Sequence, residues 1–231
     1  MTDEPTIVLA HGFWGGAAHW TNVIVELNKR GYDEIRAVEN PLTSLADDAE
    51  RTRKMVGQVD GSVVLVGHSY GGAVITEVGD LPNVKALVYI AAFAPDAGES
   101  PGRISQEHPP AAFDNIAPDS DGYPWITQDK FHESFAQDLA PRRGARHGRH
   151  AEGPRRLHLR RRRHRPAWRN KPVWYQVSTR DRMIHPDNER RMAERTNPRK
   201  VVELEATHAS LASRPQAAVD LIEEVVRETA G

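Results

Sequence analysis

The sequence predicts an α/β fold in which a mostly parallel sheet of about six strands is flanked by helices. Two observations carry this prediction. Short apolar, β-branched runs alternate with helical patterns from residue 6 onward, which is typical of strands joined by helical crossovers. The length of 231 residues and the apolar content of 39% are enough for one sizeable core, so we expect a single domain.

The strands and helices follow from local patterns. Three helices are predicted from apolar periodicity and end signals. The first follows a cap at Ser44, the second runs from Pro186 to about Thr196, and the third begins near Ser213. The long interval 94–171 breaks the alternation and predicts a cap inserted into a core formed by 1–93 and 172–231. The expected strands are 6–11, 34–39, 62–68, 84–93, 172–179 and 200–206.

The composition excludes several classes of protein. There are no cysteines, so disulfides and thiolate metal sites are ruled out. The opening "MTDEPTIVLA" lacks a basic region and a long apolar run, so we expect no signal peptide. No run approaches the length of a membrane span. We therefore expect a cytoplasmic protein that does not bind membranes.

The stretch "VLVGHSYGGAV" places Ser69 between a β-branched strand and a helix-compatible run. Gly67 and Gly71 lie two positions to either side, as in the G-x-S-x-G nucleophile elbow. In that turn the strained backbone projects the serine hydroxyl into a cleft. We predict that Ser69 is a catalytic nucleophile; the alternative is a passive serine in a glycine-rich turn.

A serine hydroxyl needs a base to take its proton, and eleven histidines are available. His208 directly follows the last predicted strand, at the same sheet edge as Ser69. The side chain of His68 should point away from the cleft, and His11 is better suited to shaping the loop after the first strand. We predict that His208 is the base.

The base in turn needs a carboxylate to hold its tautomer. Asp181 follows the fifth strand, and the order Ser69, Asp181, His208 is the one expected for this kind of triad. Asp96, after the fourth strand, is the competing acid. For either aspartate, helix capping in a loop is the structural alternative.

The segment "HGFWGG" after the first strand is a flexible turn. We expect the backbone amides of Phe13 and Tyr70 to form an oxyanion hole. Gly12, Trp14 and Trp125 are predicted to line the substrate pocket, although Trp14 is equally suited to packing under the cap.

The motifs "HGFWGGAAHW", "GHSYGG", "STRDRMI" and "THASL" resemble the small cofactor-free α/β-hydrolases that include bacterial carboxylesterases, plant methyl esterases and hydroxynitrile lyases. The resemblance implies the α/β-hydrolase fold, a triad of Ser69, Asp181 and His208, and no cofactor or metal. The lyases of this group carry Thr after the first-strand His and Lys after the catalytic His, whereas Gly12 and Ala209 stand here. Cyanohydrin cleavage is therefore not favoured.

An arginine-rich block interrupts this pattern. Residues 141–170 contain twelve Arg and one Glu, a charge of +11, so the rest of the chain carries −12 of the formal total of −1. In 141–166, 23 of 26 residues are Arg, Pro, Gly, Ala or His. An RNA-binding arm, a solvated linker and a stretch translated in a shifted reading frame remain open. We favour the shifted frame, because GC-rich codons encode this mixture, and we expect no nucleic-acid partner.

Together these features predict a serine carboxylesterase. The expected substrates are small, uncharged, largely apolar carboxylic esters, hydrolysed through an acyl-enzyme. The alternatives are a hydrolase-fold binding protein with slow turnover and a hydroxynitrile-lyase-like activity. The sequence predicts no oligomeric state.

Overall fold

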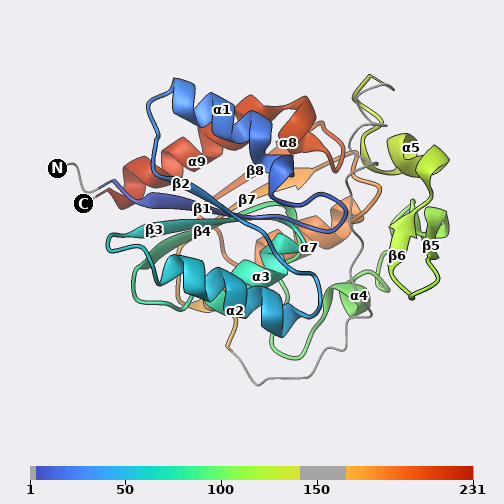
Figure 1. Ribbon diagram of the computed structural model, residues 1–231, viewed down its shortest axis with the longest axis horizontal. Coiled ribbons are helices and arrows are strands. Elements are labelled where there is room, and N and C mark those ends of the chain that lie inside the picture. Colours follow the sequence, from blue (N-terminus) through green and yellow to red (C-terminus); the bar gives the residue numbers. More distant parts are fainter. Residues whose placement is uncertain (1–3, 141–164, 231) are drawn as a thin grey trace.

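The computed structural model describes residues 4–140 and 165–230, which form a three-layer arrangement of helices on both faces of a sheet (Figure 1). The block 141–166, apart from its last two residues, lies outside the described residues. The predicted division into core, cap and anomalous segment therefore stays a prediction.

The main sheet has six parallel strands in the order β2-β1-β3-β4-β7-β8. All six predicted strands are present, each within about two residues of its expected ends. Their bounds are β1 Thr6–Ala10, β2 Ile35–Val38, β3 Val63–Ser69, β4 Val84–Ala92, β7 Val173–Ser178 and β8 Lys200–Leu204.

Helices cover both faces of this sheet (Figure 1). One face packs against α2 (Leu45–Val56), α3 (Gly71–Val78) and α7 (Pro186–Arg195). The other packs against α1 (Thr21–Lys29) and α9 (Pro215–Thr229), with the short α8 (Ser210–Ser213) leading into α9. The predicted cap at Ser44 is present, since its hydroxyl accepts a hydrogen bond from the Asp47 amide. Helix α1 was not predicted.

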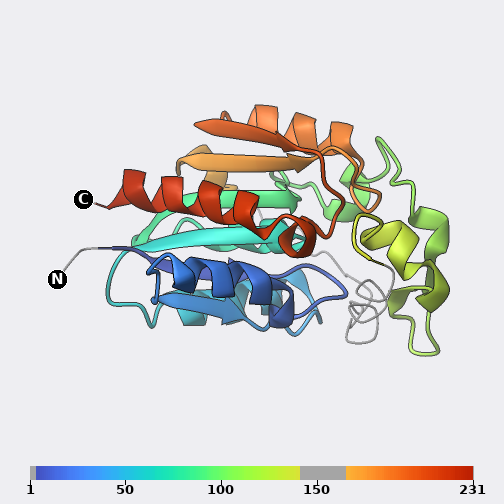
Figure 2. The same ribbon diagram turned by 90° about the horizontal axis from the view of Figure 1, so that it is seen from above.

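Residues 94–140 form a small separate layer beyond the carboxyl ends of the strands (Figures 1 and 2). It contains an antiparallel pair of short strands, as well as short helical segments. Its elements are α4 Pro101–Ile104, η2 Phe113–Asn115, β5 Ile116–Pro118, β6 Pro124–Ile126, η3 Gln128–Lys130 and α5 Phe131–Phe135. The chain rejoins the core through the single-turn helix η4 (Ala167–Arg169), after which β7 begins.

This layer packs on the sheet edge through an apolar cluster. The cluster joins Trp14, from the loop after β1, to Met183 and Ala209 from the loops after β7 and β8. Its remaining buried members come from the small layer and are Ala112, Ile126, Phe131, Phe135 and Ala136. None of the helices among the described residues is long and apolar enough to cross a membrane.

Candidate active site

Ser69 ends β3 at a sharp turn into α3, which is the strand-turn-helix setting that the elbow motif requires. Its φ of 56° lies in the left-handed region that residues other than glycine rarely adopt. The pairing of β3 with β4 also shifts register between His68 and Ser69. A Cβ at Gly71 would lie 2.1 Å from the Ala10 carbonyl oxygen, so only glycine permits this approach to β1.

Ser69, His208 and Asp181 form one hydrogen-bonded chain. Ser69 Oγ lies 2.8 Å from His208 Nε2, and His208 Nδ1 lies 2.5 Å from Asp181 Oδ2. All three residues are at most 5% exposed. A carboxylate only accepts hydrogen bonds, so Nδ1 carries the proton and Nε2 is the nitrogen that accepts from the serine hydroxyl. This arrangement can draw the hydroxyl proton onto an oriented imidazole.

The Asp181 carboxylate is held by the loop that follows β7. Its Oδ1 accepts hydrogen bonds from the amides of Met183 at 2.6 Å and Ile184 at 2.9 Å. These two bonds leave Oδ2 to face His208. The loop therefore fixes the orientation of the Asp181 carboxyl group toward His208.

Two other histidines support the loops around the site. The Nε2 of His68 donates to the His208 carbonyl at 2.9 Å, which ties the base to the elbow strand. Burial, and next the neighbouring His208, lower the pKa of His68 well below its usual value, so His68 is neutral. His11 accepts from the Asn40 amide at 2.9 Å and donates through Nδ1 to the Gly12 carbonyl at 2.7 Å, which shapes the loop after β1.

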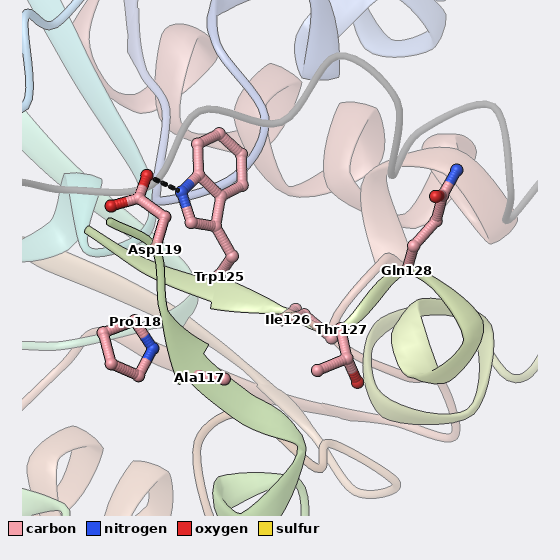
Figure 3. A pocket seen from close by; sticks show the side chains of 7 residues that line it. All are labelled: Ala117, Pro118, Asp119, Trp125, Ile126, Thr127 and Gln128. Carbon is pink, nitrogen blue, oxygen red and sulfur yellow. Dashed lines mark hydrogen bonds between the residues drawn. The ribbon is translucent and has the colours of Figure 1, made fainter. Parts of the chain in front are cut away.

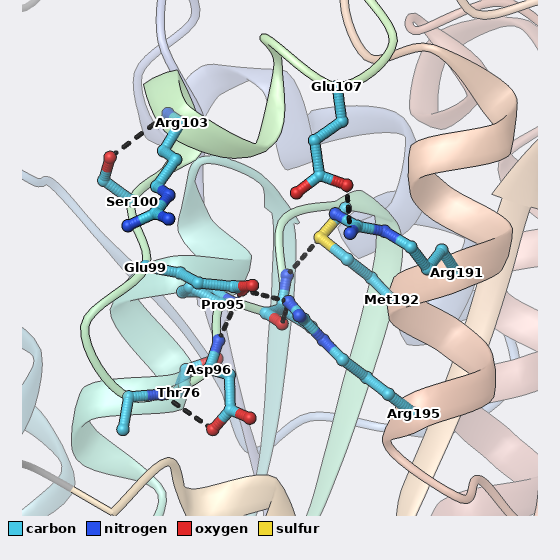
Figure 4. A network of polar contacts seen from close by, with 12 residues as sticks. Thr76, Pro95, Asp96, Glu99, Ser100, Arg103, Glu107, Arg191, Met192 and Arg195 are labelled. Atoms are coloured by element: carbon cyan, nitrogen blue, oxygen red, sulfur yellow. Dashed lines mark hydrogen bonds and ion pairs between the residues drawn. The ribbon is translucent and has the colours of Figure 1, made fainter.

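The competing acid Asp96 is engaged elsewhere. Both of its carboxylate oxygens accept from the Arg169 guanidinium, at 2.8 and 2.6 Å. Burial opposes ionisation, but the bonds from Arg169 and from the Ala97 amide outweigh it and lower the pKa of Asp96. An ion pair links the loop that carries Asp96 to α7, because Glu99 in this loop pairs with Arg195 at 2.7 Å (Figure 4). Between the two candidate acids, the structure brings only Asp181 to His208.

The loop after β1 packs directly on Ser69. A Cβ at Gly12 would lie 2.5 Å from Ser69 Cβ and 2.8 Å from Oγ, so a side chain there would displace the hydroxyl. The Phe13 ring stacks on the Tyr70 ring with centroids 4.3 Å apart, which keeps the two backbone segments together. The amides of Phe13 and Tyr70 donate no turn or loop hydrogen bond within the described residues. They remain our predicted oxyanion hole.

The two tryptophans proposed for the pocket lie in different surroundings. Trp14 is 7% exposed in the apolar cluster, and its indole donates to the Pro124 carbonyl at 2.8 Å. Trp125 donates to Asp119 at 2.8 Å and borders a hollow of about 530 Å³ on the β5 and β6 pair (Figure 3). No triad residue lines that hollow. Packing under the small layer, which the sequence left open for Trp14, is what the structure shows.

Asp138 is a residue that the sequence reasoning missed. Its Oδ1 accepts from the Thr207 hydroxyl at 2.7 Å, and its Oδ2 accepts from the Ser213 hydroxyl at 2.8 Å. The Ala209 amide also donates to the Phe135 carbonyl at 3.1 Å. These contacts fasten the segment after α5 to the loop that carries His208. No local sequence signal marks them, because the partners are about 70 residues apart.

One group of side chains has the composition of a metal site. Ligand atoms of His108, His185 and Asp187 all lie within 4.8 Å of one another. The two imidazole rings stack, with their centroids 5.3 Å apart and an interplanar angle of 28°. His185 Nδ1 also accepts the Asp187 amide at 3.2 Å. We therefore assign no metal ligands to this group.

Curated relatives match part of the chain. The chain is 33% identical over 106 residues to a carbendazim hydrolyzing esterase of Nocardioides sp. (strain SG-4G), and the match covers 40% of this chain and 44% of the relative. It is 30% identical over 122 residues to methylesterase 7 of Arabidopsis thaliana, covering 46% of each. The chain thus spans under half of the length of these relatives.

Solved structures match nearly all of the chain. Polyneuridine aldehyde esterase has a TM-score of 0.81 at 18% identity, covering 96% of this chain and 99% of that one. A pyrethroid hydrolase from Sphingobium faniae JZ-2 has a TM-score of 0.78 at 20% identity, covering 96% and 97%. At these identities the likeness shows the fold.

A protein-family model matches most of the chain, including most of the sheet and its helices. Residues 7–221 match the alpha/beta hydrolase family, a range that contains the elbow and the loops after β7 and β8. The six-stranded parallel sheet with helices on both faces agrees with that match. The chain therefore belongs to the alpha/beta hydrolase family.

Proposed function

We propose that this protein is a serine carboxylesterase that hydrolyses small, uncharged, largely apolar carboxylic esters. The hydrogen-bonded chain from Ser69 through His208 to Asp181 is the observation that carries the proposal. The names of the two curated relatives, an esterase and a methylesterase, support the same reaction class.

In the first half of the reaction, Ser69 Oγ attacks the ester carbonyl carbon while His208 Nε2 takes the hydroxyl proton. Asp181 holds the imidazole in the required tautomer and stabilises the imidazolium that forms. The amides of Phe13 and Tyr70 stabilise the negative charge on the carbonyl oxygen. His208 then gives its proton to the leaving alcohol, and an acyl-Ser69 ester remains.

In the second half, water replaces the alcohol. His208 takes a proton from water, the resulting hydroxide attacks the acyl carbon, and Ser69 recovers its proton as the carboxylic acid leaves. Apart from the ester and the water, both halves use only groups of this chain. The site therefore acts with its own residues alone.

The surroundings of the triad favour an apolar substrate. The Phe135 ring meets the His208 ring edge to face, with centroids 4.8 Å apart. Met183, two residues after the acid, and Ala209, directly after the base, belong to the same apolar cluster as Phe135. An apolar acyl or alcohol group gains from burial against such side chains, whereas a charged one loses hydration.

The direct test measures hydrolysis of p-nitrophenyl acetate and butyrate by the wild type and by Ser69→Ala. Loss of the nucleophile should lower kcat/KM on the order of 10⁴-fold or more, with an unchanged circular dichroism spectrum. A fluorophosphonate probe should add its mass to the peptide that contains Ser69. Residual activity within about tenfold of the wild type would contradict the assignment.

The two alternatives give different results in the same experiments. A slow-turnover binding protein would acylate Ser69 stoichiometrically without sustained release of p-nitrophenol. A lyase would release cyanide from mandelonitrile above the uncatalysed rate. We expect no such release, because Ala209 follows His208 and cannot present an ammonium group to a leaving cyanide.

A further inference from the structure

Glu189, in the first turns of α7, is a fully buried acid. One carboxyl oxygen, Oε2, accepts from the Ser178 amide at 3.0 Å. The other, Oε1, has no hydrogen-bond partner among the described residues as long as the carboxyl carries no proton. An ionised carboxylate with one unpaired oxygen would destabilise the folded protein here, because burial removes the water that stabilises its charge.

The charged group beside Glu189 is the Asp181 carboxylate. The two residues meet at Ser178, whose amide donates to Glu189 Oε2 and whose carbonyl accepts from the Asp181 amide at 3.1 Å. Asp181 already accepts three hydrogen bonds, from the Met183 and Ile184 amides and from His208, whereas Glu189 accepts only the one from Ser178. Two adjacent buried carboxyl groups do not both ionise, so the proton belongs on Glu189.

The other groups around Glu189 agree with this assignment. Burial, and then the Asp181 charge, raise the pKa of Glu189 well above its usual value. From β7, Tyr175 faces it as a neutral phenol whose hydroxyl donates to the Ala92 carbonyl. On α7 itself, the Arg190 guanidinium is bound by Glu203 at 2.7 Å and Asp187 at 2.9 Å on the surface.

We propose that Glu189 stays a neutral carboxylic acid at physiological pH and donates its proton to the Asp181 carboxylate, as a positioning residue for the catalytic acid. The proposal rests on the proposed function of the site. Glu189 gives Asp181 a fourth donor, from α7 instead of from the loop that carries the Met183 and Ile184 amides. The hydrogen bond restrains the carboxylate that orients His208 without adding a second negative charge.

The kinetic test compares three variants in ester hydrolysis. Glu189→Gln retains an acceptor for the Ser178 amide and an N–H donor for Asp181, so kcat should stay within about threefold of the wild type. Glu189→Met has a similar length but neither group, so kcat should fall about tenfold with KM unchanged. Glu194→Met makes the same change at an exposed position of α7 and should alter neither constant.

The pH profile adds a readout that a purely structural role would not move. If Glu189 is neutral throughout, the profiles of kcat/KM for the wild type and Glu189→Gln should superimpose from pH 5 to 8. A loss of more than about tenfold in Glu189→Gln would mean that an ionised carboxylate is required, and would overturn the proposal. Wild-type kcat in Glu189→Met would overturn it as well.

A second test needs no activity, so it separates this inference from the proposed function. Above the usual Glu pKa of 4.5, the unfolded chain has lost this proton while the folded chain keeps it. The unfolding constant of the wild type, divided by that of Glu189→Gln, should therefore rise about tenfold per pH unit from roughly pH 5 upward. A ratio independent of pH would show an ionised Glu189. A rising ratio in a protein without esterase activity would leave Glu189 protonated but refute the proposed function.

Discussion

Two aspartates follow neighbouring strands at the same edge of the sheet and have opposite surroundings. Asp96, after β4, has a side chain that is 31% exposed and doubly hydrogen-bonded to Arg169. Asp181, after β7, has a fully buried side chain that meets two amides and His208. Strand position alone made both candidates for the same role. The two differ in their partners: Asp181 contacts His208 and can orient it, whereas Asp96 forms an ion pair with Arg169.

The largest difference is expected when the same substitution, aspartate to asparagine, is made at both positions. Asp181→Asn should lower kcat about 10⁴-fold, because an amide cannot hold His208 in the tautomer that accepts the Ser69 proton. Steady-state ester hydrolysis measures the effect, and Asp96→Asn is its matched control. If Asp96→Asn were the more damaging change, the orienting acid would lie after β4.

A smaller loss of activity is expected from adding a methyl group at a glycine, and its size should depend on which end of the sheet the glycine lies at. Gly12→Ala places a methyl group against Ser69 Oγ and should lower kcat by roughly 10 to 100-fold, because a displaced nucleophile reacts poorly. Gly61→Ala adds the same methyl group before β3, at the opposite edge of the sheet, where nothing lies within 4 Å. Equal kinetics for the two variants would show that the loop after β1 tolerates a side chain.

The smallest expected effect belongs to the ion pair. Asp96→Asn should leave kcat within about twofold of the wild type and lower the free energy of unfolding by about 0.5 to 1 kcal/mol, as is usual for a partly exposed pair. Urea denaturation measures this loss, which should shrink in high salt. A loss of several kcal/mol would mean that the network of Figure 4 holds α7 in place.

The residues with strong local signals were predictable. Ser69 is marked by its glycines and its β-branched strand, and all six strands of the sheet are marked by apolar runs. Contacts between distant segments were not. The Trp14 indole bonds to Pro124, 110 residues away. Helical spacing places Glu189 on the same face of "PDNERRMAER" as the buried Met192, but an acidic side chain gives no sign that it is buried. Their burial is decided by which loops meet at the sheet edge, and a single sequence does not encode that in any local pattern.

The anchors on either side of 141–164 define a site for protein engineering. On one side Asp138 is tied to Thr207 and Ser213, and on the other the Trp168 indole donates to the Pro95 carbonyl at 3.0 Å. Each anchor is hydrogen-bonded to the core independently of the other. A replacement segment between them therefore does not have to supply these contacts. Loop-closure entropy also makes each doubling of segment length cost only about 0.6 kcal/mol. Libraries of different lengths can thus be exchanged here while His208 keeps its support.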